Sequence, residues 1–302
     1  MKILRAEHLG MCFGVRDAIE MALEESRSQP LTVLGDLVHN ESVLANLSAR
    51  GIHIAQRAER LETQAVMITA HGASDKAIRQ AESRGHQVKE ATCPLVRLAH
   101  QAVTKLVHEG FHPVIIGKRD HVEVRGMTED LENFDVVLTE ADVFELREQE
   151  RLGVIAQTTQ PIDRVRHLVG LLRWRFPAAN VRFIDTVCQP TKQRQNSAIE
   201  LAQQCDVVVV IGGAHSNNTH ELVKTCSQHC SWVYHIQTAD DLRPSWFAGA
   251  SRVGITAGTS TPDAIIEGVE TWLQHYAVEM ETAATGIPAA DGRPNPQHLK
   301  AA

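Results

Sequence analysis

Three of the six cysteines in this 302-residue chain occupy equivalent places in the sequence. Cys12, Cys93 and Cys188 each follow a short extended segment, and each opens a segment whose apolar residues recur at helical spacing. This recurring order of strand, loop, cysteine and helix predicts three similar α/β modules in one chain. If the modules surround an approximate threefold axis, the three thiols meet at one point, because ligands of open α/β sheets bind beyond the carboxyl ends of the strands.

Three converging thiols suggest a metal centre. Thiolates at helix N-termini are expected to have lowered pKa values and are soft ligands, which favours an iron–sulfur cluster, zinc or Cu(I). A structural zinc site usually has four ligands with CxxC spacing, and this spacing does not occur in the sequence. A cluster held by three cysteines leaves one iron open for chemistry. Cys205, Cys226 and Cys230 lack the shared placement and are interpreted as small buried hydrophobic residues.

Hydrogen-bond donors suited to an anion follow several predicted strands. Imidazoles, hydroxyls, amides and the N–H groups of helix N-termini together form a phosphate-binding set. Taken singly, each such residue is more often a turn or N-cap residue. The residues are His39, Asn40, His71, Ser74, His121, Thr158, Thr159, Ser216, Asn217, Asn218 and Ser260. Neither a P-loop motif nor a GxGxxG motif that opens a first βαβ unit is present, which disfavours nucleotides as ligands.

Glu123 is the one carboxylate embedded among these donors. Two interpretations of this residue are open: a solvated loop charge, or a proton donor. Burial beside a polyanionic ligand would raise the pKa of its carboxyl group toward neutrality, which is the property that a general acid needs.

The elements that must position these residues alternate between strand and helix. Helical spacing of apolar residues is found between the strands, for example at 15–26, 94–110, 164–176, 195–205 and 262–277. This alternation predicts an α/β fold with mostly parallel sheets, arranged as a trefoil of three modules around a pseudo-threefold axis. We expect modules at 13–93, 94–188 and 189–280, with 1–12 joined to the third module, and a disordered tail at 281–302. Strands are expected at 2–4, 31–35, 65–70, 112–117, 134–139, 152–157, 181–185, 206–212, 230–236 and 252–258.

The composition limits the possible partners. The chain has 30 Lys and Arg against 37 Asp and Glu, a formal net charge of −7, which argues against a nucleic-acid-binding surface. Its longest apolar stretch falls far short of a membrane helix, and charged residues at the N-terminus argue against a signal peptide. We therefore expect a cytoplasmic protein without a membrane or nucleic-acid partner.

Nine motifs of the chain, in order and spacing, resemble those of the 4-hydroxy-3-methylbut-2-enyl diphosphate reductase family, the last enzyme of the methylerythritol phosphate route to isoprenoids. The resemblance runs from about residue 5 to 280. The sequence departs from the family pattern at Met11, Val122 and Asn217, where Phe, Pro and Ser are usual. The motifs are GMCFGVRDAIEMA, GDLVHN, ITAHGAS, ATCPLV, HVEV, QTT, DTVCQPTKQRQ, GGAHSNNTHEL and TAGTSTPD.

The resemblance implies one central [4Fe-4S] cluster per chain, held by Cys12, Cys93 and Cys188. It also implies that Thr158 and Glu123 face the hydroxyl end of an allylic diphosphate, with Glu123 supplying a proton. The electron donor implied is an external ferredoxin or flavodoxin, because the sequence has no flavin or nicotinamide motif. The residues that the resemblance assigns to the diphosphate are His39, His71, Ser216, Asn218 and Ser260, with His121 nearby and Asn217 able to donate a hydrogen bond.

Two other functions remain open from the residues. A non-redox hydro-lyase would use the open iron only as a Lewis acid and would need no electrons. A non-enzymatic protein, such as a cluster-based sensor or an anion-binding module, would not depend on Glu123, His39 or His71. Activity with a low-potential electron donor separates the reductase from both.

Overall fold

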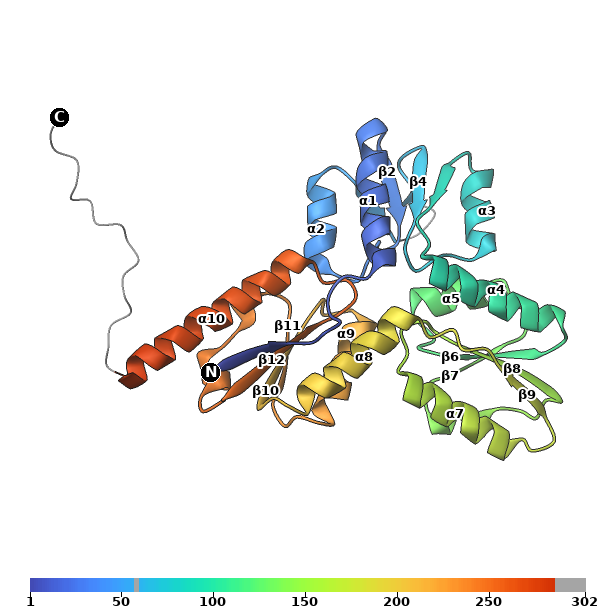
Figure 1. The fold of residues 1–302 in the computed structure, drawn as a ribbon. Coiled ribbons are helices and arrows are strands. Elements are labelled where there is room, and N and C mark those ends of the chain that lie inside the picture. Colours follow the sequence, from blue (N-terminus) through green and yellow to red (C-terminus); the bar gives the residue numbers. More distant parts are fainter. Residues whose placement is uncertain (57–59, 286–302) are drawn as a thin grey trace.

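The computed structural model describes residues 1–56 and 60–285, whose strands form three four-stranded sheets in three lobes (Figure 1). Every strand pair in the three sheets is parallel. The α/β trefoil expected from the sequence is confirmed. The strands are β1 (Lys2–Arg5), β2 (Leu31–Leu34), β3 (His53–Ala55), β4 (Ala65–Ile68), β5 (Gln87–Glu90), β6 (His112–Ile116), β7 (Asp135–Val137), β8 (Arg151–Ala156), β9 (Asn180–Phe183), β10 (Val207–Ile211), β11 (Val233–Ile236) and β12 (Arg252–Ala257).

The three sheets share one strand order, which makes the pseudo-threefold repeat explicit. The orders are β3-β2-β4-β5, β7-β6-β8-β9 and β11-β10-β12-β1. In each of the first two sheets, the chain first forms the strand in the second position, then the edge strand beside it, then the strand in the third position and finally the opposite edge strand. In the third sheet β1, from the start of the chain, takes the position that β5 and β9 hold in the others.

Helices cover the sheets, and most of them connect consecutive parallel strands. They are α1 (Phe13–Ser28), α2 (Glu41–Ala49), α3 (Asp75–Ser83), α4 (Pro94–His108), α5 (Val122–Thr128), α6 (Glu140–Glu145), α7 (Ile162–Arg175), α8 (Gln189–Ala202), α9 (Asn217–Ser227) and α10 (Asp263–Thr285), with 3-10 turns η2 (Ala239–Asp241) and η3 (Pro244–Phe247).

Strand β10 shows why the apolar runs become central strands. Val207 and Val209 face a cluster formed with α10, whereas Val208 and Val210 face a cluster formed with α8 and α9. Because successive side chains point to opposite faces, a strand covered by helices on both sides must be apolar at every position. The sheet of the third lobe is therefore buried on both faces, and only the loops at the carboxyl ends of its strands remain for chemistry.

The sequence prediction missed two strands, although all ten expected segments contain one. β3 and β5 lie at the two edges of the first sheet. β3 has only three residues, and β5, with the sequence QVKE, is mostly exposed. Polar edge strands lack the apolar run that reveals a buried strand.

The C-terminal helix α10 extends to Thr285, beyond the start of the expected tail at 281–302. The rest of that segment, 286–302, lies outside the described residues. Within residues 1–56 and 60–285, no helix combines the length and apolarity needed to cross a membrane.

Candidate active site

Each of the three cysteines follows the fourth strand position of its sheet and forms the N-cap of the next helix. Cys12 precedes α1, Cys93 precedes α4 and Cys188 precedes α8. The backbone N–H of each cysteine donates to a carbonyl just after the third-position strand of its sheet. These bonds are Cys12 to Thr259 (3.0 Å), Cys93 to Ala70 (3.0 Å) and Cys188 to Thr158 (3.0 Å). The repeat therefore places three thiols equivalently, one from each lobe.

The three thiols lie near one another. All three cysteines are free and half-buried, and none of their side chains forms a capping hydrogen bond to its helix. The thiols of Cys93 and Cys188 interact electrostatically with Cys12 and with Glu123. Three helix N-termini therefore direct their unpaired N–H groups toward the same sulfur-lined region, which suits an anionic centre.

The three sulfurs do not all lie close enough together for one metal ion. Sulfurs around a single tetrahedral zinc lie about 3.8 Å apart, given a Zn–S bond of about 2.3 Å. Within the described part of the chain, only the imidazoles of His39, His71 and His121 bring three ligand atoms within 4.8 Å of one another. The three cysteines therefore do not form a mononuclear site, whereas their donor chemistry fits an iron–sulfur core.

Gly14, in the first turn of α1, provides the room for this arrangement. A Cβ atom at this position would lie 2.4 Å from Sγ of Cys93 and 2.9 Å from its Cβ. No side chain larger than hydrogen fits there unless Cys93 moves. The close approach of α1 to Cys93 brings the Cys12 loop and the Cys93 loop together.

The expectation of lowered thiol pKa values is wrong for Cys93 and Cys188. Burial raises the pKa of the Cys93 thiol, and it raises the pKa of Cys188 to about 11, although the nearby backbone N–H groups at the starts of α4 and α8 act in the opposite direction. The Cys188 thiol also lies 3.1 Å from Oγ1 of Thr191. A metal centre must therefore displace protons from these thiols when it binds.

Glu123 forms a buried pair with Thr158. Its carboxylate accepts the backbone N–H of Thr158 at 2.6 Å and the hydroxyl of the same residue at 3.0 Å. The Glu123 side chain is 1% exposed, and burial raises its pKa to about 7, against the lowering effect of both hydrogen bonds. A carboxyl group with this pKa is half-protonated at neutral pH, as a general acid requires.

The three histidines form a compact cluster beside this pair. The ring centroids of His39 and His71 lie 4.3 Å apart, and His121 lies 5.2 Å and 5.6 Å from them. Burial lowers the pKa of all three: that of His121 falls to about 3, and that of His71 falls well below its usual value. In the absence of an anion, the cluster is therefore neutral at pH 7.

Hydrogen bonding to His121 argues against a metal ion among the histidines. Nδ1 of His121 accepts the backbone N–H of Glu123 at 3.2 Å, so the neutral ring carries its hydrogen on Nε2. Nε2 is then a donor and cannot bind a metal ion as neutral imidazole. Together the three rings are better suited to an anion than to a cation.

Unsatisfied donors surround the same space. The buried nitrogens Nε2 of His39, Nδ1 of His71 and Nδ2 of both Asn217 and Asn218 have no hydrogen-bond partner. Oδ1 of Asn218 accepts the backbone N–H of Thr259 at 3.0 Å, which fixes the amide so that Nδ2 is left over. Because buried polar groups are nearly always satisfied, such a cluster of orphaned nitrogens indicates an absent acceptor-rich ligand.

Two serines connect these donors to the neighbouring loops. Ser216 caps α9 by accepting the N–H of Thr219 at 3.3 Å, and the hydroxyl of Ser260 donates to the carbonyl of His39 at 3.0 Å. Ser260 therefore joins the third lobe to the first. A cavity of about 30 Å³ remains among the donors, and it is lined by Val15, Val38, His39, His71, His121, Thr159, Ser216, Asn217, Asn218, Thr259 and Ser260.

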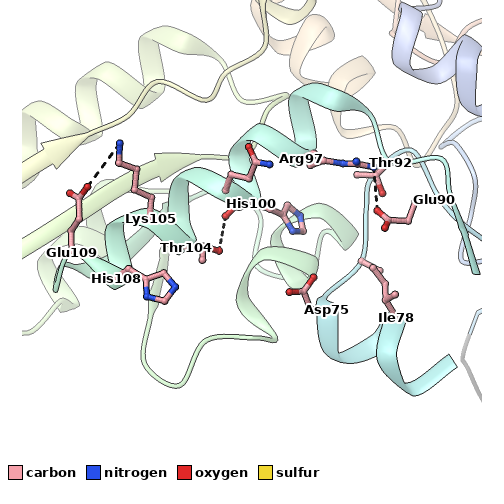
Figure 2. Close-up of a pocket in the computed structure, with 12 residues that line it drawn as sticks. Asp75, Ile78, Glu90, Thr92, Arg97, His100, Thr104, Lys105, His108 and Glu109 are labelled. Carbon is pink, nitrogen blue, oxygen red and sulfur yellow. Dashed lines mark hydrogen bonds and ion pairs between the residues drawn. The ribbon is translucent and has the colours of Figure 1, made fainter. Parts of the chain in front are cut away.

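A larger cavity, of about 790 Å³, lies away from this centre, along α3 and α4 (Figure 2). Its charged side chains are paired locally, as with Arg97 and Glu90 or Lys105 and Glu109. Its polar groups therefore do not converge on a common point. Hydrogen-bond donors converge on the small cavity among the histidines, and no such group of donors converges on the larger cavity.

The structure thus brings most of the expected residues into two adjoining groups, with Glu123 and Thr158 between the thiols and the anion donors. The expected donors Asn40 and Ser74 instead cap α2 and α3. Sequence reasoning missed Gly14, Thr259 and Arg194. Arg194 lies inside a quoted motif, but a charged residue on a helix usually indicates a solvated face. The roles of Gly14 and Thr259 depend on contacts with residues far away in the sequence, which no local pattern reports.

Fold and site together define a class: a three-lobed α/β protein with a thiol-lined centre next to a pocket of anion donors. The family model described as LytB protein matches residues 3–274. The chain belongs to the LytB protein family.

Named relatives share nearly the whole chain. A protein of Aquifex aeolicus (strain VF5), named 4-hydroxy-3-methylbut-2-enyl diphosphate reductase, is 39% identical over 280 residues, which cover 90% of this chain and 96% of the relative. A protein of the same name from Geobacter sulfurreducens is 36% identical over 278 residues, covering 91% and 98%.

Two solved structures are similar as well. One is described as (E)-4-hydroxy-3-methyl-but-2-enyl diphosphate reductase, the terminal enzyme of the non-mevalonate pathway; it is 36% identical, with a TM-score of 0.66, over 91% of this chain and 100% of that one. The other, from Plasmodium falciparum, is described as E-1-hydroxy-2-methyl-but-2-enyl-4-diphosphate reductase. It is 25% identical, with a TM-score of 0.86, over 90% and 88%.

Proposed function

We propose that this chain reductively removes the hydroxyl group of 4-hydroxy-3-methylbut-2-enyl diphosphate, yielding isopentenyl and dimethylallyl diphosphate. The single observation that carries the proposal is the adjacency of three lobe-equivalent thiols to a buried general acid and a cluster of unsatisfied anion donors. The reaction breaks the C–O bond and consumes two electrons and two protons, one of which leaves with the hydroxyl as water.

The diphosphate is bound by the unsatisfied donors. The imidazoles are neutral without a ligand, and the negative charge of a diphosphate would favour their protonated forms, so that the rings become donors as the substrate binds. The proposed set is His39, His71, His121, Ser216, Asn217, Asn218 and Ser260.

Glu123 and Thr158 act at the other end of the substrate. With a pKa of about 7, Glu123 holds a proton at neutral pH, and the hydroxyl of Thr158 lies 3.0 Å from its carboxylate. We assign Glu123 the transfer of this proton to the leaving hydroxyl, and Thr158 the orientation of that hydroxyl. Both residues touch the reacting end, and His121 is held against Glu123 by the hydrogen bond to its backbone.

The cofactor proposed is one [4Fe-4S] cluster per chain, bound by Cys12, Cys93 and Cys188. When bound, it supplies the electrons and a Lewis-acidic iron with an open coordination position. An external ferredoxin or flavodoxin provides the electrons. The six free cysteines fit a reducing compartment, and the proposed location is the cytoplasm.

The non-redox hydro-lyase is not favoured, because the relatives that span nearly the whole chain are named as reductases. The deciding experiment uses the full chain, purified without oxygen, with a low-potential donor and the hydroxymethylbutenyl diphosphate. We expect donor oxidation that depends on substrate. If the cluster is intact but the donor is not oxidised when substrate is added, the proposal is refuted. If the substrate is dehydrated without consumption of electrons, the hydro-lyase is supported.

Replacement of Glu123 tests the proton donor. A Glu123→Gln variant should lose activity by about 10²–10⁴-fold, the usual contribution of general acid catalysis. The wild-type rate should fall as the pH rises above about 7, because Glu123 loses its proton. This high-pH fall in the rate should be missing in the variant. Thr159→Ser, a conservative change in the cavity wall next to Thr158, serves as the control and should keep the high-pH fall.

A further inference from the structure

Arg194, in the second turn of α8, is a buried cation that ties the first turn of its own helix to the Cys12 loop. The residue is 8% exposed. Its Nε donates to the carbonyl of Gly10 at 2.9 Å, and its Nη1 donates to the carbonyl of Pro190 at 3.0 Å. Gly10 stands two residues before Cys12, and Pro190 stands two residues after Cys188, so the guanidinium group is held against the backbone next to both cysteines.

No carboxylate compensates this charge. Within residues 1–56 and 60–285, Arg194 has no ion pair, whereas its neighbour Lys192 is paired with Asp185 at 2.8 Å. The ionisable groups that act electrostatically on Arg194 are the thiols of Cys12 and Cys188. A buried arginine is costly to leave unpaired, so its natural counter-ions here are these two sulfurs in their deprotonated form.

We propose that Arg194 is the buried counter-cation of the thiolates of Cys12 and Cys188 and thereby raises the reduction potential of the cluster that they hold. This inference rests on the proposed function, which assigns the cluster to these sulfurs. Reduction adds negative charge to the centre, and a fixed cation in a low-dielectric site favours the more negative state. Arg194 acts through the thiolates and is therefore a positioning residue.

A purely structural role would rest on the two hydrogen bonds alone, which join the Cys12 loop to the start of α8. The two roles are separable by substitution. Arg194→Gln removes the charge and at least one hydrogen bond, whereas Arg194→Lys keeps the charge but cannot reproduce the planar fork of the guanidinium group. Lys192→Gln, which removes a cation from the same helix that is already paired with Asp185, is the matched control.

The experiment measures iron and sulfide content and the midpoint potential of the reconstituted full-length chain, by redox titration followed with electron paramagnetic resonance. We expect Arg194→Gln to move the midpoint to a more negative potential, Arg194→Lys to move it less, and Lys192→Gln to leave it near that of the wild type. Loss of iron from Arg194→Gln but not from Arg194→Lys also supports the proposal.

Three results would overturn it. The first is a fully loaded Arg194→Gln variant with the wild-type midpoint. The second is an equal shift in Arg194→Gln and Arg194→Lys, and the third is loss of iron from both, since hydrogen bonding alone would then suffice. A wild-type chain that binds no iron at all is a different failure, because it removes the proposed function itself.

Discussion

At the scale of single residues, burial sets the chemistry of the site. Glu123 is made a weaker acid and the three histidines weaker bases by the same loss of solvation, since water favours the charged form of every one of these groups. The ligand-free site therefore holds little net charge. A polyanion that enters it changes the protonation of all these groups in the same direction, toward more bound protons.

This coupling predicts proton uptake when a diphosphate binds. The pKa values of His39, His71 and His121 are lowered in the free protein and should rise beside the ligand, so protons are taken up at neutral pH. Titration calorimetry with inorganic diphosphate, in buffers of different ionisation enthalpy, should show a binding enthalpy that varies with the buffer. A His71→Asn variant should take up fewer protons, and a buffer-independent enthalpy in the wild type would contradict the prediction.

The raised pKa of Glu123 also predicts a stability cost. The folded protein binds a proton on this group up to about pH 7, whereas the unfolded chain releases it near 4.5, so this contribution to the free energy of unfolding is lost as the pH rises between those values. At 1.36 kcal/mol per unit, the loss approaches about 3 kcal/mol. In urea unfolding of the metal-free protein, the free energy of unfolding of Glu123→Gln should rise relative to that of the wild type between pH 5 and 8. A constant difference would show that the carboxyl group titrates normally.

At the scale of elements, the same strand–cysteine–helix unit is used three times, and its precision depends on close helix contacts. Gly14 lets the first turn of α1 lie against Cys93, which belongs to the start of α4. Residues of one unit thus shape the thiol position of another. The cysteines are positioned in pairs by neighbouring elements rather than by their own loops alone.

Substitution of Gly14 tests this dependence. In Gly14→Ala the new Cβ would meet Sγ of Cys93 at 2.4 Å, so Cys93 must move and the iron content after reconstitution should fall severalfold. Gly170→Ala is the matched control, because nothing lies within 4 Å of a Cβ at that position in α7. The control should bind iron normally and gain about 0.5–1 kcal/mol of stability. Equal iron content in both variants would rule out the steric role of Gly14.

At the scale of the whole molecule, the proposed substrate site lies where three lobes meet. Its cavity of about 30 Å³ has room for roughly two water molecules, given about 10–15 Å³ of probe-occupied volume for each, and cannot admit a diphosphate. The lobes or the loops between them must therefore separate for substrate to enter. Polar contacts between lobes then decide how readily the site closes again.

The ion pair between Arg164 of α7 and Glu221 of α9 is such a contact, at 2.9 Å. Because Glu221 is only 5% exposed, Arg164→Gln should weaken the closed arrangement and raise KM by about 5–30-fold, equivalent to about 1–2 kcal/mol, with little change in kcat. Steady-state kinetics measure both constants. Arg166→Gln, which affects only an exposed pair within α7, is the control and should leave KM unchanged. A wild-type KM in Arg164→Gln would show that the pair does not contribute to closure.

The sequence alone determined the repeat and the central strands, and it named most of the residues that the structure gathers at the candidate site. Runs such as 206–212 are apolar because both faces of the strand are covered, and polar residues follow them because parallel strands expose only their carboxyl-end loops. Tertiary structure decided the rest. The edge strand β3 is too short and β5 too polar to be recognised. The pKa values of Cys93 and Cys188 rise because packing outweighs the effect of their helix termini, and Arg194 is buried where the distant Cys12 loop packs against α8. Local patterns report which face of an element is covered, but distances between lobes depend on how the lobes pack.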